Sequence, residues 1–185
     1  MSLVIEKAEK PTDEVRALIL LLEDELSPHY EPHQRHGLKL EAIFQPGIHF
    51  FLARRSDEVL GCGGIALYPG FAEVKRMFVR RQARGQGIAD AIMDRLAEVA
   101  RQSGRPMLRL ETGDCQQAAV RFYRRYGFGF CPPFEPYSTM PPENIATSIF
   151  MEKRLFSLSS ALCSCCMSKG LTRHVAPAGR SAGLV

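Results

Sequence analysis

The feature that most constrains this 185-residue chain is an abrupt change of apolar periodicity near its middle. Residues 72–79 read as a strand, and the segment Arg84-Gly85-Gln86-Gly87 follows closely. An apolar stripe with helical spacing then begins at once and consists of Ile88, Ala91, Ile92, Leu96 and Val99. A strand, a glycine turn and an amphipathic helix in this order predict an anion site at the amino terminus of the helix.

The chemistry of the glycine turn favours a phosphate group as the anion. The first N–H groups of a helix have no partner within it, the helix dipole adds positive potential, and glycine lets an anion approach the main chain. Arg80, Arg81 and Arg84 add charge. The nucleotide-binding P-loop needs Lys-Ser/Thr after its last glycine, where this chain has Ile88-Ala89, and the dinucleotide fingerprint needs a third, later glycine. A tight connection with solvated arginines stays open as the alternative.

The other segments alternate between strand and helix patterns. Strand patterns cover residues 3–8, 49–54, 59–67, 107–111, 128–131 and 147–155. Helix patterns cover residues 13–26, behind the cap residue Thr12, and residues 116–126, with a short helix around residues 38–44 left open. The expected fold is therefore α/β, a mixed sheet flanked by helices, in the order β-α-(α)-β-β-β-α-β-α-β-β.

Length and charge limit the classes of protein to consider. We predict one domain over residues 1–156 and a disordered or loosely attached tail over residues 157–185, which are rich in Ser, Ala, Gly and Cys. The net charge is +4, but residues 1–156 carry 21 basic and 20 acidic residues, which argues against a nucleic-acid partner. No apolar run approaches the roughly 18 to 20 residues of a membrane span, so we expect a cytoplasmic protein without a membrane partner.

No metal site is expected. Three cysteines lie far apart and are interpreted as small apolar side chains in a reduced compartment: Cys62, Cys115 and Cys131. Three more are crowded without completing a zinc ligand set: Cys163, Cys165 and Cys166. Prolines interrupt the helical spacing of three histidines, which favours a solvated loop: His29, His33 and His36.

Two landmarks in order support a more specific interpretation. The first landmark is the pattern Arg/Gln-x-x-Gly-x-Gly/Ala, which is matched by Gln82, Gly85 and Gly87 and, in an overlapping register, by Arg84, Gly87 and Ala89. The second landmark follows later and is Ala119-x-x-Phe122-Tyr123-x-x-x-Gly127-Phe128. In these landmarks the chain resembles the GNAT superfamily of acyl-CoA N-acyltransferases, over most of residues 3–155. The resemblance implies a mostly antiparallel sheet and acetyl-CoA as cosubstrate. The residues that it implies for acetyl-CoA binding are Met77, Phe78, Val79, Gln82, Arg84, Gly85, Gln86, Gly87, Ile88, Ala89 and Gln116, where Gln116 stands in place of the family's frequent Asn.

The resemblance also implies a direct transfer of the acetyl group to an amine. An alkyl amine is only about four parts in ten thousand neutral at pH 7, so a base must remove a proton before attack. Glu73 or Glu111 could serve, directly or through water, and Glu73 is preferred. The alternative is that both carboxylates pair with neighbours such as Lys75 or Arg109. Tyr123 matches the family tyrosine near the CoA sulfur and is the expected proton donor to the leaving thiolate, with core packing as its alternative role.

The acceptor is expected to be a small, amino-acid-like primary amine. Residues 29–47 are rich in donors such as Tyr30, Arg35 and Lys39, which suit an anionic acceptor better than a polyamine. The proline-rich residues 131–144 are interpreted as a lid or as a fixed surface loop. The sequence leaves three other functions open: a peptide or protein N-acetyltransferase, a non-catalytic acyl-CoA-binding regulatory module, and a nucleic-acid-binding protein. It also leaves open a covalent acyl-cysteine route through Cys62 or Cys115, and a homodimer.

Overall fold

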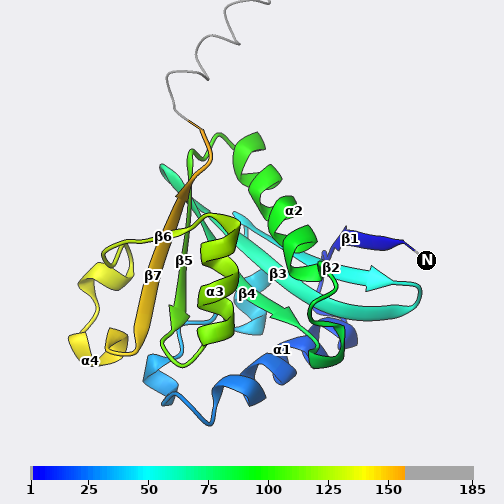
Figure 1. Cartoon of the computed structure of the whole chain (residues 1–185), viewed down its shortest axis with the longest axis horizontal. Coiled ribbons are helices and arrows are strands. Elements are labelled where there is room, and N and C mark those ends of the chain that lie inside the picture. The colour runs from blue at the N-terminus through cyan, green and yellow to red at the C-terminus, as the bar shows by residue number, and fades with distance from the viewer. Residues whose placement is uncertain (1, 157–185) are drawn as a thin grey trace, which may run out of the picture.

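Seven strands form one sheet in the order β1-β2-β3-β4-β5-β7-β6 in the computed structural model, which describes residues 2–156 (Figure 1). The expectation of a tail over residues 157–185 lies outside the described residues. The strands are β1 (Leu3–Lys7), β2 (Ile48–Arg55), β3 (Glu58–Tyr68), β4 (Phe71–Val79), β5 (Met107–Gly113), β6 (Gly129–Phe130) and β7 (Ser148–Arg154). The helices are α1 (Asp13–Leu26), α2 (Ile88–Gln102), α3 (Gln117–Tyr126) and α4 (Pro142–Ile145). The mixed, mostly antiparallel sheet predicted from the sequence is confirmed.

The sheet opens between its two central strands. All neighbours pair antiparallel except β4 and β5, which are parallel. Their pairing runs only from Ala72 opposite Leu108 to Val74 opposite Leu110, although both strands continue beyond it. Backbone groups along the facing edges beyond Val74 therefore have no strand partner. In Figure 1, α3 lies over the region where the two strands separate.

Helices cover both faces of the sheet, because side chains alternate along each strand. On β2, Phe51 and Ala53 join the core cluster that contains the buried side of α2. Phe50 and Leu52 point the other way and join the cluster that contains Val15 and the rest of the apolar stripe of α1. The helices α1 and α2 thus pack on opposite faces, and the end of α1 lies beside the opening between β4 and β5.

A β-bulge interrupts β4 next to this opening. Cys62 of β3 lies opposite Phe78, whereas Gly64 lies opposite Lys75, so β4 contains one extra residue over this stretch. Arg76 takes up the extra length with a φ of 53°, a conformation that is uncommon outside glycine. Its Nε donates to the Leu38 carbonyl at 2.7 Å, and its guanidinium also pairs with a carboxylate of α1, so contacts on both sides hold the bulge.

The structure defines three local elements in more detail. The open helix near residues 38–44 is a 3-10 turn, Leu40–Phe44, and another 3-10 turn spans Pro32–Gln34. The helix after the glycine segment begins at Ile88, where the apolar stripe starts, and Gly87 is its N-cap. Residues 131–144 contain a 3-10 turn, Tyr137–Thr139, and the start of α4, and buried Phe134 and Tyr137 pack against Phe150 of β7. Burial of these two rings favours a fixed segment over a lid.

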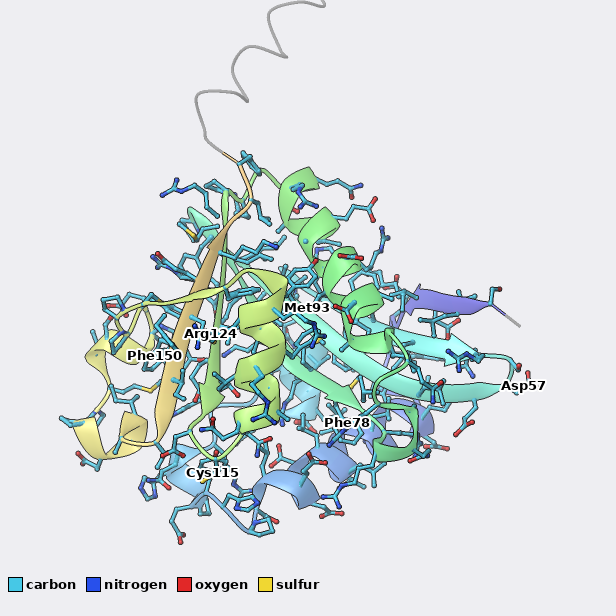
Figure 2. All side chains as sticks on the ribbon, viewed as in Figure 1. Asp57, Phe78, Met93, Cys115, Arg124 and Phe150 are labelled. Atoms are coloured by element: carbon cyan, nitrogen blue, oxygen red, sulfur yellow. The ribbon has the colours of Figure 1, made fainter. Side chains whose placement is uncertain are left out.

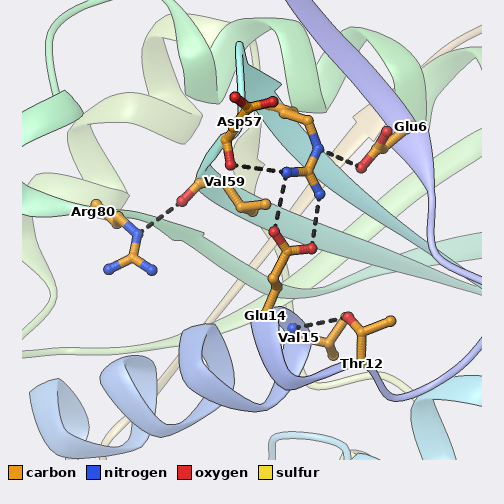
Figure 3. A network of polar contacts seen from close by, with 8 residues as sticks. Glu6, Thr12, Glu14, Val15, Asp57, Val59 and Arg80 are labelled. Atoms are coloured by element: carbon orange, nitrogen blue, oxygen red, sulfur yellow. Dashed lines mark hydrogen bonds and ion pairs between the residues drawn. The ribbon is translucent and has the colours of Figure 1, made fainter.

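A charged network attaches α1 to the edge of the sheet (Figure 3). Thr12 caps α1 as predicted, since its hydroxyl accepts from the Val15 N–H. Arg54 of β2 forms a bidentate pair with Glu14, with Nη1–Oε1 and Nη2–Oε2 distances of 3.0 and 2.7 Å. Its Nε also donates to Glu6 of β1 at 2.9 Å. One guanidinium therefore joins α1, β1 and β2.

We expect Arg54→Met to lower the free energy of unfolding by about 1 to 2 kcal/mol at pH 7. The hydrogen bond from Arg54 holds the pKa of the Glu14 carboxyl below its ordinary value, against an opposing effect of burial. A lowered folded-state pKa stabilises the protein above the unfolded-state pKa, and this contribution disappears as the pH falls through the folded-state value. Urea unfolding should therefore show a smaller difference near pH 4. Lys7→Met, which removes an exposed pair with Glu9, is the control and should change stability by less than about 0.5 kcal/mol.

Candidate active site

A cleft of about 520 Å³ lies where β4 faces the starts of α2 and α3. One wall is the part of β4 beyond the last β4–β5 pair, and the opposite wall comes from the apolar side of α3. The floor is the glycine segment that precedes α2. The cleft therefore begins at the predicted anion site and runs along the unpaired edge of β4.

The glycine segment has the geometry of an anion cradle. Gly85 and Gly87 have φ values of 78° and 76°, which favour glycine. No described atom beyond the neighbouring residues lies within 4 Å of where a Cβ would stand on either one. Within the described part of the chain, the only backbone hydrogen bond donated by residues 85–91 is that of Ala91 to the Gly87 carbonyl. The open space and the unpaired N–H groups fit a pyrophosphate.

Arg84 lies at the rim of this cradle and is held by two groups of the protein. Its Nε donates to the Val79 carbonyl at 3.0 Å. Its Nη2 pairs with both oxygens of Glu25, on the last turn of α1, at 2.8 and 3.0 Å. Arg84 therefore presents a positive charge to the cleft, and Glu25 partly compensates that charge.

Most of the residues predicted to bind acetyl-CoA line this cleft. Those brought together there are Met77, Phe78, Val79, Arg84, Gly85, Gly87, Ile88, Ala89 and Gln116. Gln82 and Gln86 line a separate surface depression instead. The Gln86 amide accepts from Arg55 at 2.6 Å and donates to the Gln82 carbonyl at 3.2 Å, so it braces the turn from outside.

A second pocket, of about 130 Å³, continues from the cleft toward residues 30–37. The two cavities share five lining residues: Leu22, Met77, Gln116, Ala119 and Tyr123. Four segments form the rest of the second pocket, namely the end of α1, residues 30–37, the β4 bulge, and the end of β5. A molecule in the second pocket would meet one in the cleft beside Tyr123 and Met77.

Tyr123 stands at this junction. It is buried on α3, and burial and then the charge of Glu111 raise the pKa of its hydroxyl above the ordinary value. The phenol therefore stays protonated at neutral pH. Among the described residues its hydroxyl has no hydrogen-bond partner, while its ring packs edge-on against Phe122 and Phe128. The hydroxyl is thus available to a ligand.

Glu111 lies at the end of β5 and lines the second pocket. Its Oε1 accepts a hydrogen bond of 2.7 Å from the Ser148 hydroxyl of β7. Burial raises the pKa of the Glu111 carboxyl, against the lowering effects of the Ser148 hydrogen bond and of His36 and Lys75. A half-buried carboxylate with a raised pKa in a pocket is suited to accept a proton.

Glu73, the carboxylate preferred from the sequence, occupies a different environment. Its side chain is fully buried and lines neither cavity. Its Oε1 accepts from the Tyr137 hydroxyl at 2.6 Å and pairs with the Lys75 ammonium at 2.7 Å. The pairing with Lys75, considered as an alternative, is therefore present. The other anticipated partner, Arg109, instead pairs with Glu152 at 3.1 Å.

Several contacts of this region join segments that are distant in the sequence and could not be predicted from it. Tyr137 reaches Glu73 from the proline-rich stretch, where an aromatic residue was the only signal in the sequence. The His36 Nε2 lies 3.0 Å from the Asn144 carbonyl, so this histidine belongs to the pocket wall and not to a solvated loop. The Tyr30 hydroxyl accepts from the Cys115 N–H at 2.8 Å, and Figure 2 shows Cys115 at the start of α3.

Neither candidate cysteine has the surroundings of a nucleophile. Cys62 is fully buried, and burial raises the pKa of its thiol to about 12. Cys115 is exposed, and no histidine among residues 2–156 lies within hydrogen-bond distance of it. Across the same residues no group of three or more His, Cys, Asp or Glu side chains is placed to hold a metal ion. No helix in this described part is long and apolar enough to cross a bilayer.

Comparison with known proteins relates this geometry to a family. Residues 18–128 match the acetyltransferase (GNAT) family. The chain is 41% identical over 145 residues to an IAA acetyltransferase of Azospirillum brasilense, covering 77% of this chain and 92% of the relative. It is 34% identical over 126 residues to an aminoalkylphosphonate N-acetyltransferase of Salmonella typhimurium, covering 63% and 78%. A crystal structure from Klebsiella pneumoniae, classed as an acyl-CoA N-acyltransferase, superposes with a TM-score of 0.66 at 33% identity, covering 83% of this chain and 98% of that one.

The family match spans the glycine cradle, the opening between β4 and β5, and α3 with Tyr123. The chain therefore belongs to the acetyltransferase (GNAT) family and is an acyl-CoA N-acyltransferase.

Proposed function

We propose that this enzyme transfers an acetyl group from acetyl-CoA to the primary amine of a small acceptor that also carries an anionic group. The observation that carries the proposal is the second pocket, which joins the cofactor cleft at Tyr123 and contains both carboxylate and guanidinium groups. Its volume of about 130 Å³ lies below the roughly 300–1,000 Å³ of drug-sized sites, which favours a small acceptor.

The cofactor cleft supplies three kinds of contact for acetyl-CoA. The unpaired N–H groups at Gly85 and Gly87, together with Arg84, would hold the pyrophosphate. The free edge of β4 at residues 77–79 would offer backbone donors to the pantetheine arm and to the acetyl carbonyl oxygen. The bound cosubstrate would supply an activated thioester. Side-chain identity along this edge matters less than the absence of a strand partner.

We assign the role of general base to Glu111. It lines the pocket, whereas Glu73 is enclosed by Lys75 and Tyr137. Directly or through one water, Glu111 would accept the proton that leaves the acceptor ammonium. The amine nitrogen then forms a bond to the acetyl carbon as the carbon–sulfur bond breaks, with no acyl-cysteine step.

Tyr123 takes the role of general acid. The pKa of its hydroxyl is raised, so the group carries a proton at neutral pH, and the residue lines both cavities. Donation of this proton to the departing sulfur would prevent the release of a free thiolate into the cleft. The acceptor nitrogen releases two protons in all. The first goes to Glu111 before attack and from there to solvent, and the second leaves as the amide forms and replaces, through water, the proton that Tyr123 gives to CoA.

The name of one relative agrees with an anionic acceptor. The Salmonella relative is an aminoalkylphosphonate N-acetyltransferase, whose name joins an amine to a phosphonate. A peptide amino terminus is the second candidate acceptor, because the chemistry of the amine is the same. The small volume of the pocket favours the first candidate.

We expect Gly87→Ala to weaken acetyl-CoA binding by about tenfold or more, because a Cβ would enter the cradle and disfavour the φ of 76°. Gly104→Ala is a matched control: its φ is 67°, and no described atom lies near its Cβ position, but it follows the far end of α2. Isothermal titration calorimetry measures both. An equal loss of affinity in the two variants would argue against the cradle.

Thiol release from acetyl-CoA, followed with a disulfide reagent across amino acids, aminophosphonates, polyamines and short peptides, tests the reaction. We expect release that depends on a small anionic amine, and a decrease in kcat of about a hundredfold in Tyr123→Phe with little change in acetyl-CoA affinity. Acetyl-CoA binding without release for any amine would favour the regulatory module. Unchanged kcat in Tyr123→Phe would leave the tyrosine with a packing role.

The pH dependence distinguishes Glu111 from Glu73. A base must be deprotonated, so kcat/KM should fall as the pH drops through the raised pKa of Glu111, above the ordinary value of 4.5. Glu111→Gln should remove this limb and lower kcat/KM by about a hundredfold or more. Glu152→Gln, which removes a carboxylate from the Arg109 pair outside both cavities, should keep the parent profile. Dividing kcat/KM of the variant by kcat/KM of the parent at each pH removes the titration of the acceptor amine, because that titration is the same for both enzymes.

A further inference from the structure

The wall of the second pocket formed by α1 and the segment after it carries an excess of positive charge. Glu23 of α1 is shared by two guanidinium groups: its Oε2 accepts from Arg35 Nη1 at 3.0 Å, and its Oε1 pairs with Arg76. All three residues line the pocket. Two positive charges against one negative charge leave a net charge of +1 at this end.

The Arg35 side chain retains an unused donor in this wall. Its Nε is buried and has no hydrogen-bond partner among the described residues, although Nη1 is paired with Glu23. The Nη2 group of Arg35 likewise has no hydrogen-bond partner among the described residues, and unlike Nε it is not buried, so it can donate to an acceptor group in the pocket. Carboxylates and phosphonates can accept two parallel hydrogen bonds from the guanidinium of an arginine.

The opposite end of the pocket has the opposite balance. Glu111 and Lys75 line this part of the pocket, but the charge of Lys75 is balanced by its direct pair with the buried Glu73. This leaves a net charge of −1 next to Tyr123 and the opening to the cofactor cleft. The pocket therefore carries charge of both signs: the side with Glu111 attracts an ammonium, and the side with Arg35 and Arg76 attracts an anion.

We propose that Arg35 is the residue that determines acceptor specificity, by binding the carboxylate or phosphonate of the acceptor, and that Glu23 is its positioning residue. The assignment rests on the proposed acetyl transfer and deepens it. Bound in this way, the acceptor directs its amine toward Glu111, because each of its charged ends lies next to the wall of opposite sign. An amine without an anionic group lacks this orientation.

Arg76 is less suited to this role although it lines the same pocket. Its Nε is used by the Leu38 carbonyl, its Nη1 is used by Glu23, and only 6% of its side chain is exposed. Arg35 has 24% exposure and the free Nε. Arg76 also remains paired with Glu23 if Arg35 is replaced, so a substitution at Arg35 leaves no unpaired carboxylate. An Arg35 variant should therefore fold.

The test compares three acceptors of matched size: an α-amino acid, the 1-aminoalkylphosphonate with the same side chain, and the corresponding amine without an anionic group. In Arg35→Met, the ratio of kcat/KM for an anionic acceptor to that for the anion-free amine should fall by about tenfold to a hundredfold, mainly through KM. Arg35→Lys should recover part of the ratio, since lysine keeps the positive charge but lacks the planar, bidentate donor geometry of the guanidinium. Arg16→Met, an exposed arginine of α1 outside the pocket, should keep the parent ratio.

The carboxylate and phosphonate arms identify which anion is preferred. A parent ratio near one, or a ratio that Arg35→Met leaves unchanged, would overturn the assignment while leaving amine acetylation intact. Calorimetry of the amino acid and the phosphonate with the CoA-saturated protein decides the subsite independently of turnover. Binding that Arg35→Met abolishes supports the subsite even if no acceptor is acetylated, in which case the proposed function alone fails.

Discussion

The separation of β4 and β5 is the constraint on which the rest of the site depends. Parallel pairing ends at Val74 and Leu110 while both strands continue, so one edge of a central strand is left unpaired inside the molecule. An unpaired internal edge is costly unless a ligand or solvent uses its polar groups. Here the cofactor cleft runs along that edge, and α3 brings Tyr123 over it. The bulge at Arg76 marks the same stretch and gives β4 its irregular course.

Two carboxylates on neighbouring strands acquire different roles from their surroundings. Glu73 is enclosed by Lys75 and Tyr137, which makes it part of the framework behind the pocket. Glu111 receives one hydrogen bond from Ser148 and remains beside open space. The negative charge of Glu73 also contributes to the raised pKa of Glu111, so the buried group influences the one that lines the pocket.

Local patterns predicted the parts of the fold that depend on neighbours in the sequence. The Thr12 cap, the apolar stripe of α2 and the left-handed glycines before it follow from short-range chemistry, and the structure contains each of them. Such patterns do not predict contacts between segments that are distant in the sequence. The pairing of Tyr137 with Glu73 joins residues 64 positions apart. Likewise, the sequence does not reveal that Glu111 lines the pocket whereas Glu73 is fully buried.

The last turn of α1 carries Glu23 and Glu25, two positions apart. Glu23 pairs with Arg35 and Arg76 in the acceptor pocket, while Glu25 pairs with Arg84 at the phosphate cradle. A rigid shift of this turn cannot alter one set of ion pairs without altering the other. If one ligand binds better to a particular position of α1, its binding therefore changes the affinity for the second ligand. By thermodynamic reciprocity, the second ligand changes the affinity for the first by the same factor. Under the proposed assignment of the two cavities, one helical turn would couple the binding of the acceptor to the binding of acetyl-CoA.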